Sequence, residues 1–321
     1  MAATPRWGIT VPLQGYPLPE QREIIAALPD LGYTDAWSSE LSGTDAFTPL
    51  VLASQWTDQI RFGTAIAAIY TRGPALLAMT AATLADLAPG RFVMGIGTST
   101  RVVVEEWNDV PFEAPYQRSR DTLRFLKAAL TGEKVTARYE TFKVSGFRLE
   151  RAPAVAPDLA LAALRPQMVR LAADEAGAAI TNWLSPADVP KVRAAAGQDC
   201  ELIARIFVLP TTDADLARTI GRRLVTAYLT VPAYAAFHEW LGRGEAIRPM
   251  REKWAAGDRR GASDAVPDEV IDDLVIHGDL ETCRHRVDAY RAAGLDTPVI
   301  AVIPPPGIDV ADAVRGLAPP A

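Results

Sequence analysis

The chain of 321 residues has few of the features that mark several common classes of protein. Its two cysteines, Cys200 and Cys283, are too few to staple such a length and lack the spacing of metal ligands. A net charge of −6 argues against a broad nucleic-acid-binding surface. No stretch approaches the ~18 uncharged apolar residues of a membrane span. Residues 1–6 lack a basic region followed by an apolar run, so no signal peptide is expected. We therefore expect a soluble, cytoplasmic protein without nucleic-acid or membrane partners.

Lysine and histidine are also scarce. Only five of the 33 basic residues are lysine, and the rest are arginine. The three histidines form no cluster with metal-ligand spacing, so no metal site is expected. What the chain does have is a globular composition, with 49% hydrophobic and 22% charged residues. Its length is within the range of one large α/β barrel.

Short apolar runs alternate with amphipathic segments along most of the chain. Such alternation, without the two-residue turns of hairpins, predicts parallel β/α units. Eight units in one chain favour a (β/α)8 TIM barrel over two doubly wound domains. The predicted strands are Arg6–Val11, Thr34–Ser38, Ile60–Ile66, Arg91–Gly97, Leu159–Ala163, Ala178–Asn182, Leu202–Leu209 and Pro298–Ile303.

Two segments do not fit a simple barrel unit. Residues 131–150 are predicted to form an irregular or hairpin excursion, and about 213–262 a helical insertion near the C-terminal strands. Val231–Pro232 is expected to break that insertion. We expect residues 1–321 to be a single barrel domain carrying these two insertions.

A TIM barrel places its active site at the C-terminal ends of its strands. This rule selects Trp37–Glu40, Thr64–Ile66, Gly97–Thr100, Leu164–Pro166 and Thr181–Trp183. The glycines at 95 and 97 also resemble part of a dinucleotide fingerprint, but position 100 is threonine, so that signal is weak. Small residues here fit either the interior of a barrel or the space beneath a flat ring.

These segments together resemble the luciferase-like monooxygenase superfamily, barrel oxidoreductases that use flavin or the deazaflavin coenzyme F420. Residues 31–40 are similar to its G-(F/Y)-x-x-x-W-x-S-(E/D)-H motif, and residues 60–66 to its I-x-L-G-T-x-(V/I) strand. The pattern continues through residues 72–98, and residues 278–294 resemble the closing helix that ends in Ala-Gly. The order and spacing of these pieces extend over about 260 residues.

The resemblance implies specific roles at the barrel mouth. A non-prolyl cis peptide is expected at Ala65–Ile66, forming a bulge behind the central ring of the cofactor. The cofactor's phosphate is expected near Leu164, Arg165 and the following helix, where free N–H groups and a positive dipole end favour an anion. The residues expected to bind the cofactor are Ser39, Thr64, Ala65, Ile66, Gly97, Thr98, Ala163, Leu164 and Arg165.

Glu40 occupies the family's acidic position, and we expect it to orient substrate or relay a proton. The sequence departs from the family pattern nearby. Leu41 stands where histidine is frequent, Thr100 where some sugar-phosphate dehydrogenases carry glutamate, and Arg165 where glycine usually precedes the proline. The residue that would donate a proton to the substrate is therefore not identified by the sequence.

Three functions are consistent with these residues. The first is an F420-dependent oxidoreductase that transfers a hydride between reduced deazaflavin and a small organic substrate. The arginine-rich composition is typical of GC-rich genomes, which favours this cofactor. The second is an FMN-dependent monooxygenase that uses O2 and reduced flavin from a reductase partner. The third is a cofactor-binding protein without turnover. The resemblance also implies a homodimer.

Overall fold

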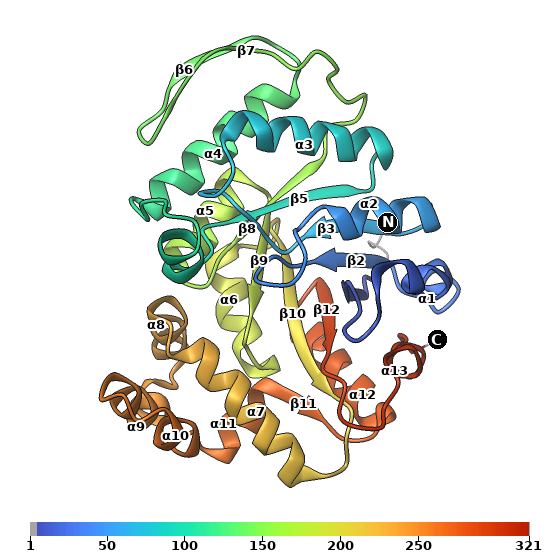
Figure 1. The fold of residues 1–321 in the computed structure, drawn as a ribbon, viewed down its shortest axis with the longest axis vertical. Helices are drawn as coiled ribbons and strands as arrows, with labels where there is room; N and C mark the ends of the chain where they lie inside the picture. Colours follow the sequence, from blue (N-terminus) through green and yellow to red (C-terminus); the bar gives the residue numbers. More distant parts are fainter. Residues whose placement is uncertain (1–4, 321) are drawn as a thin grey trace.

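Eight parallel strands close into a barrel at the centre of the molecule (Figure 1). The computed structural model describes residues 5–320. The barrel closes because β1 pairs with the last strand as well as with β2. The predicted (β/α)8 TIM barrel is therefore confirmed. In spatial order its strands are β1 (Gly8–Val11), β2 (Asp35–Ser38), β3 (Arg61–Thr64), β5 (Phe92–Gly97), β8 (Asp158–Ala162), β9 (Ala178–Asn182), β10 (Glu201–Leu209) and β12 (Thr297–Val302).

Two short strands extend this sheet. After β3 ends, β4 (Ala67–Ala68) pairs with the upper part of β5. Strand β11 (Val275–His277) pairs with the end of β10. Strand β11 was not predicted, because its three residues directly follow a helix and show no alternation of their own.

Helices cover the outside of the barrel (Figure 1). Several begin with proline in the first turn, where the missing N–H costs no helical hydrogen bond. They are η1 (Leu18–Gln21), α1 (Arg22–Ala27), α2 (Thr48–Trp56), α3 (Pro74–Leu87), the π-helical turn η2 (Val102–Glu106), α4 (Pro115–Leu130), α5 (Pro166–Glu175), η3 (Pro186–Asp188), α6 (Val189–Ala196), α12 (Leu280–Ala292) and α13 (Val310–Gly316).

The two segments that interrupt the β/α alternation lie at opposite ends of the long axis in Figure 1. The first is an antiparallel hairpin of β6 (Val135–Arg138) and β7 (Lys143–Phe147). The second contains α7 (Ala214–Leu229), α8 (Pro232–Leu241), α9 (Gly244–Ala255) and α10 (Arg259–Asp264), with α11 (Asp268–Leu274) after it. The break between α7 and α8 falls at Val231–Pro232 as predicted. The assignment of residues 1–321 to a single domain stays a prediction.

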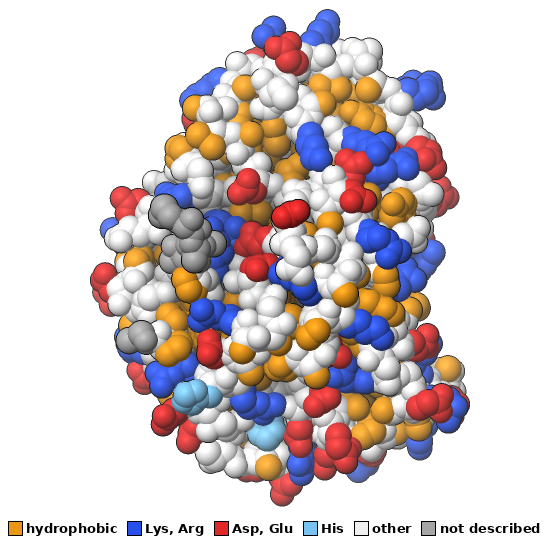
Figure 2. All heavy atoms as spheres, turned by 180° about the vertical axis from the view of Figure 1, so that it is seen from behind, with side chains coloured by type: hydrophobic (Ala, Val, Ile, Leu, Met, Phe, Trp, Pro, Cys, Tyr) orange, Lys and Arg blue, Asp and Glu red, His pale blue; other side chains and the backbone are white. Residues whose placement is uncertain are grey.

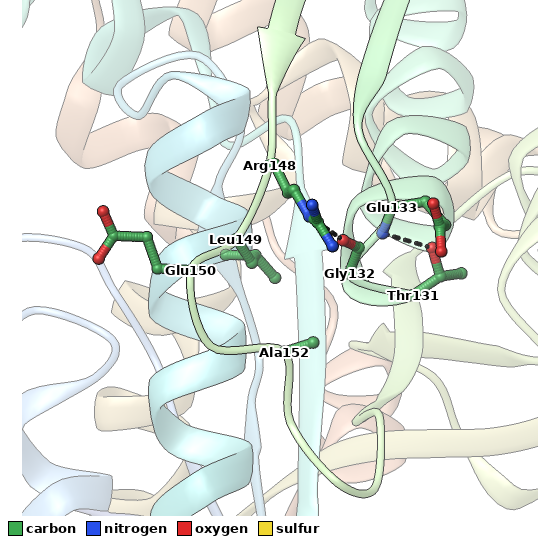
Figure 3. A pocket seen from close by; sticks show the side chains of 7 residues that line it. All are labelled: Thr131, Gly132, Glu133, Arg148, Leu149, Glu150 and Ala152. Atoms are coloured by element: carbon green, nitrogen blue, oxygen red, sulfur yellow. Dashed lines mark hydrogen bonds between the residues drawn. The ribbon is translucent and has the colours of Figure 1, made fainter.

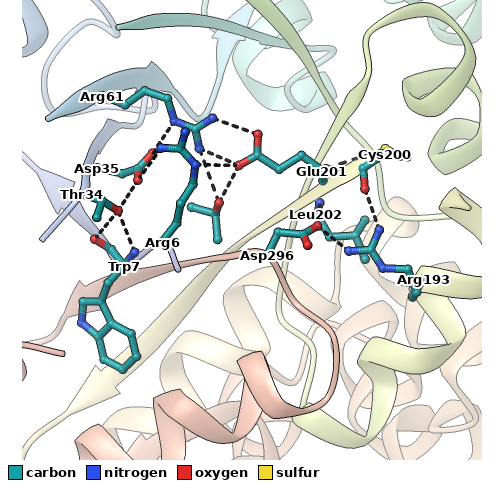
Figure 4. A network of polar contacts seen from close by, with 11 residues as sticks. Arg6, Trp7, Thr34, Asp35, Arg61, Arg193, Cys200, Glu201, Leu202 and Asp296 are labelled. Carbon is teal, nitrogen blue, oxygen red and sulfur yellow. Dashed lines mark hydrogen bonds and ion pairs between the residues drawn. The ribbon is translucent and has the colours of Figure 1, made fainter. Parts of the chain in front are cut away.

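An ionic layer closes the N-terminal end of the barrel (Figure 4). Arg61 donates to Asp35 at 2.5 Å and to both carboxylate oxygens of Glu201 at 2.9 and 2.6 Å. Thr297 also donates to Glu201, and Arg6 pairs with Asp35. Above this layer an apolar cluster fills the barrel with Trp37, Val93, Ala160, Ala178, Ile180, Ile203 and Val299.

The surface shows no extended patch of one charge on the face seen in Figure 2, where acidic and basic side chains are interspersed. Within residues 5–320, no helix combines the length and apolar character needed to cross a bilayer. The expectation about a signal peptide concerns residues 1–6, of which 1–4 lie outside the described part of the chain.

Candidate functional site

The end of β3 forms the floor of the barrel mouth. The peptide bond between Ala65 and Ile66 is cis, as the family resemblance predicted. Both residues are half-buried, so each keeps part of its surface open at the mouth. The backbone then resumes pairing at β4, with Ala67 opposite Ile96 and Ala68 opposite Gly97. The strand therefore has a bulge at the predicted position.

Two glycines of β5 make room for this bulge. A Cβ atom on Gly95 would lie 1.9 Å from the carbonyl oxygen of Thr64, which no side chain can tolerate. A Cβ atom on Gly97 would lie 2.8 Å from Cβ of Ala162 and 2.8 Å from Cγ1 of Ile66. The structure thus brings Ile66, Gly97 and the end of β8 together. The pattern of glycines at 95 and 97 reflects this close packing of strands.

The predicted hydroxyl groups differ in their availability. The Thr64 hydroxyl is buried and donates to the Gly95 carbonyl at 2.6 Å, so it ties β3 to β5. Thr98 is half-buried, and its hydroxyl donates to the Ser99 carbonyl at 3.3 Å. Ser39 is half-buried at the end of β2. Ser39 and Thr98 therefore remain the better candidates for contact with a ligand.

Glu40 follows β2 and is held from two directions. Arg72 donates to both of its carboxylate oxygens, with Nη1–Oε1 and Nη2–Oε2 distances of 2.6 Å. The backbone N–H of Ala46 donates to Oε2 at 3.0 Å. The Arg72 guanidinium also lies 5.0 Å from the centroid of the Phe47 ring. This arrangement ties the β2–α2 loop to the segment that follows β4.

Two of the three departures from the family pattern, Leu41 and Thr100, supply no acid or base. Leu41 is 54% exposed at the start of the β2–α2 loop. The hydroxyl of Thr100 accepts from the Val103 N–H at 3.4 Å, at the start of the η2 turn. Both side chains are unable to transfer a proton to a substrate at neutral pH.

The segment after β8 leads into helix α5. The Ala163 N–H donates to the Ile180 carbonyl at 2.8 Å, which fixes this segment beside β9. Leu164 is half-buried, and Arg165 is exposed at the residue that precedes the helix. The Arg165 side chain caps no helical N–H, and within residues 5–320 it forms no ion pair. The predicted phosphate region therefore offers a cation and the first turn of a ten-residue helix.

Sequence reasoning missed one charged residue of the mouth, Arg205 on β10. It faces the same side of the strand as Ile203 because side chains alternate along a strand, and Ile203 belongs to the cluster inside the barrel. Its neighbours include Tyr228 and Tyr234 of the helical insertion. The available signal was an arginine within an otherwise apolar strand.

Asn182 and Trp183, which end β9, have separate roles. Asn182 is half-buried and its Nδ2 donates to the hydroxyl of Tyr234 at 3.2 Å. Trp183 is buried and stacks on Phe207, with ring centroids 4.1 Å apart. Trp183 therefore packs in the core, and Asn182 faces the polar group around Arg205.

A surface hollow lies at the other end of the barrel (Figure 3). It is formed by the end of α4 and the segment after β7, and Arg148 crosses it to donate to the Gly132 carbonyl at 3.0 Å. Helices of a β/α barrel run antiparallel to the strands, so the end of α4 marks the N-terminal end of the barrel. This hollow is separate from the barrel mouth, where the predicted site residues lie. Within residues 5–320, no group of three or more His, Cys, Asp or Glu side chains is placed to hold a metal.

Comparison with known proteins agrees with this architecture. The family model described as luciferase-like monooxygenase matches residues 4–297. The chain belongs to this family. Membership of the luciferase-like monooxygenase family makes the protein an oxidoreductase.

Curated relatives and solved structures match most or nearly all of the chain. A putative coenzyme F420-dependent oxidoreductase of Mycobacterium tuberculosis is 26% identical over 313 residues, covering 87% of this chain and 89% of that protein. The structure of the coenzyme F420-dependent tetrahydromethanopterin reductase of Methanopyrus kandleri is similar with a TM-score of 0.78 and 22% identity, covering 98% of each chain.

A structure with a different cofactor has the same fold. It is the oxygenating constituent of 3,6-diketocamphane monooxygenase of Pseudomonas putida in complex with FMN. The TM-score is 0.64 at 15% identity, with 98% of this chain and 97% of that chain covered. At these identities the solved structures establish the fold alone.

Proposed function

We propose that the protein is a coenzyme F420-dependent oxidoreductase that transfers a hydride between the deazaflavin and a small organic substrate. The observation that carries this proposal is the floor of the mouth, where Thr64 lies against Gly95 and Ile66 against Gly97. The names of the F420-dependent relatives support the choice of cofactor.

The residues at the mouth fit a flat ring with a phosphate-bearing tail. Ala65, Ile66 and Ala162 are half-buried and small or apolar, and the buried Gly97 lies between Ile66 and Ala162, which suits a planar ring. At the edge of this floor, Arg165 and the N–H groups that begin α5 suit a phosphate. Pro166 lacks an N–H group and pre-sets the first turn of the helix.

When bound, F420 would supply a ring carbon that accepts or donates a hydride, and the protein would supply position and electrostatics. Ala65 and Ile66 would support one face of the ring. Ser39 and Thr98 would provide hydroxyl groups near its edge. Glu40, held by Arg72, would fix the β2–α2 loop that borders the substrate side.

Titration of the purified protein with F420 and, separately, with FMN tests the choice of cofactor. We expect F420 to bind more tightly than FMN. Arg165→Ala should lower the affinity for F420 by about tenfold, because a charge-assisted contact to the phosphate is lost. Arg170→Ala, an exposed arginine farther along α5, is the matched control and should bind like the wild type. Tight FMN binding without F420 binding would contradict the proposal.

An FMN-dependent monooxygenase is the second candidate. The likeness to the FMN complex of 3,6-diketocamphane monooxygenase favours it, since the same floor also suits a flavin ring. Such an enzyme would need a reductase partner to supply reduced flavin. Oxygen consumption with reduced FMN and a panel of ketones is the measurement that would support this alternative.

We also propose that the protein forms a homodimer. Helix α3 carries apolar side chains on its outer face, with Leu76 and Met79 each 51% exposed and Leu87 40% exposed. Several exposed apolar side chains on one helix are typical of a contact with another protein. Light scattering should give twice the mass of the chain, and Leu76→Glu should lower that mass toward the monomer.

A further inference from the structure

Arg205 points into the upper part of the barrel. It lies opposite Asn182 of β9 and Val299 of β12 in the register of the sheet. On the same face of β10, Glu201 belongs to the ionic layer at the base and Ile203 to the apolar cluster above it. Arg205 therefore follows these two residues toward the C-terminal end of the strand, which is the catalytic end of a TIM barrel.

The surroundings of Arg205 are aromatic and hydroxyl-rich. Its guanidinium carbon lies 5.0 Å from the centroid of the Phe207 ring. Tyr228 and Tyr234 are its polar neighbours. The Tyr234 hydroxyl accepts from Asn182, so its own proton is available to another acceptor. Arg205 and Tyr234 are thus neighbouring groups that each carry hydrogen-bond donors.

No carboxylate neutralises Arg205 within residues 5–320, where it forms no ion pair. Its Nε atom is buried and makes no hydrogen bond to any residue from 5 to 320. Other arginines with little exposed side chain behave differently: Arg61, Arg193 and Arg243 each pair with aspartate. Burial lowers the pKa of Arg205, and the two tyrosines oppose that shift. A guanidinium kept charged in such a place is costly unless something pairs with it.

We propose that Arg205, with Tyr228 and Tyr234, forms a substrate subsite for the carboxylate group of a small organic acid. The inference deepens the proposed function, on which it rests, by naming the substrate class. It also makes Arg205 the residue that fixes the orientation of the substrate across from the Ala65–Ile66 floor.

The donor set favours a carboxylate over a phosphate. A guanidinium presents two parallel N–H groups that match the two oxygens of a carboxylate. A doubly charged phosphate would call for more than one cation, and Arg205 is the single cation in this group of residues. Phe207, whose ring centroid lies 5.0 Å from the guanidinium carbon, adds an apolar neighbour to this group.

Benzoate and its neutral analogue benzamide test this subsite on the whole protein without cofactor. Binding is measured by calorimetry and by the fluorescence of tryptophan. We expect benzoate to bind about tenfold more tightly than benzamide, or better, because only benzoate gains a charge-assisted contact with Arg205. Arg205→Met should abolish this preference, and Arg205→Lys should restore part of it. Arg170→Met, an exposed charge removed elsewhere, should keep it.

The variants also separate this proposal from its alternatives. Arg205→Met should melt no lower than the wild type, because it removes a half-buried charge that has no carboxylate partner within residues 5–320. Equal affinity for benzoate and benzamide, no binding at about 10 mM benzoate, or stronger binding of inorganic phosphate would overturn the proposal. A tenfold loss of F420 affinity in Arg205→Met would overturn it too, by assigning the arginine to the cofactor. If benzoate binds as expected but F420 does not bind the wild type, the proposed function fails and the subsite stands.

Discussion

Arg72 holds both carboxylate oxygens of Glu40, with each of the two N–O distances equal to 2.6 Å. The side chains are 19% and 15% exposed, so the pair is largely shielded from water. A third donor, the Ala46 N–H, occupies Oε2 as well. A carboxylate engaged in this way is suited to hold a loop. We therefore expect Glu40 to act by positioning the substrate side of the mouth.

Replacing either partner should have nearly the same effect. Glu40→Gln and Arg72→Met should each lower kcat/KM by about tenfold, the cost of losing a charge-assisted contact. The double variant should be little worse than the worse single variant, because both remove one interaction. Oxidation of reduced F420 serves as the assay. If Glu40→Gln lowers kcat far more than Arg72→Met does, Glu40 transfers a proton itself.

The ionic layer at the base should matter for stability alone. Arg61→Met leaves the fully buried Asp35 with the more exposed Arg6 as its remaining ion-pair partner among residues 5–320, beside the Thr34 hydroxyl that donates to it at 2.6 Å. We expect the free energy of unfolding to fall by about 3 kcal/mol or more, as when a buried pair loses one member. Urea denaturation measures this loss. Arg151→Met, which breaks a pair whose side chains are 84% and 60% exposed, should change little.

The affinity for F420 gives a second readout for Arg61→Met. It should remain that of the wild type in any folded sample, because the ionic layer lies at the opposite end of the strands from the mouth. An Arg61→Met protein that stays folded but no longer binds F420 would contradict this separation of stability from binding.

His238 should make the protein sensitive to acid. It is fully buried in α8, and neither ring nitrogen has a hydrogen-bond partner among residues 5–320. Burial, together with the nearby Arg243 charge, lowers its pKa to about 3. An unfolded histidine has a pKa of about 6.5. Between these values only the unfolded chain binds the proton, so stability should fall as the pH drops below about 6.5, by at most ~1.4 kcal/mol per pH unit.

Denaturation from pH 7 to 4 checks this dependence. His238→Phe should lose less stability over that range than the wild type does. His285→Phe replaces an exposed histidine on α12 and should follow the wild type. Parallel curves for the wild type and His238→Phe would show that His238 takes up its proton in the folded state.

Neither thiol should react in the folded protein. Cys200 is 4% exposed and Cys283 is fully buried. Burial raises the pKa of Cys283 to about 12 and also raises that of Cys200. A disulfide reagent such as Ellman's should therefore modify no cysteine at pH 8 and both after unfolding in urea. Rapid reaction of one thiol in the native state would mean that its surroundings open.

The sequence was sufficient to predict the barrel because each of its eight strands is a distinct apolar run, and because proline and glycine mark where many of the helices begin and end. The eight predicted strands all lie where expected, within a residue or two. Strand β11 escaped prediction because three residues give no period to detect. The bulge at Ala65–Ile66 came from family resemblance, since nothing in the residues Thr64 to Ala67 reveals a cis bond by composition.

The pairing of charged residues at the mouth was not predictable. Glu40 and Arg72 are 32 residues apart, and only the adjacency of β2 to β3 brings them together. Arg205 shows the same difficulty. Strands of a parallel barrel are buried on both faces, so an arginine within one has no evident direction. That it lacks a carboxylate partner becomes visible only when the neighbouring strands and helices are in place.

The choice between deazaflavin and flavin is the central claim, and a competition titration tests it most directly. Calorimetry with F420 is carried out on the wild-type protein alone and again in the presence of excess FMN. We predict one F420 site per chain whose affinity FMN lowers by less than about twofold. A protein that binds FMN tightly, and then fails to bind F420 with or without it, would contradict the account.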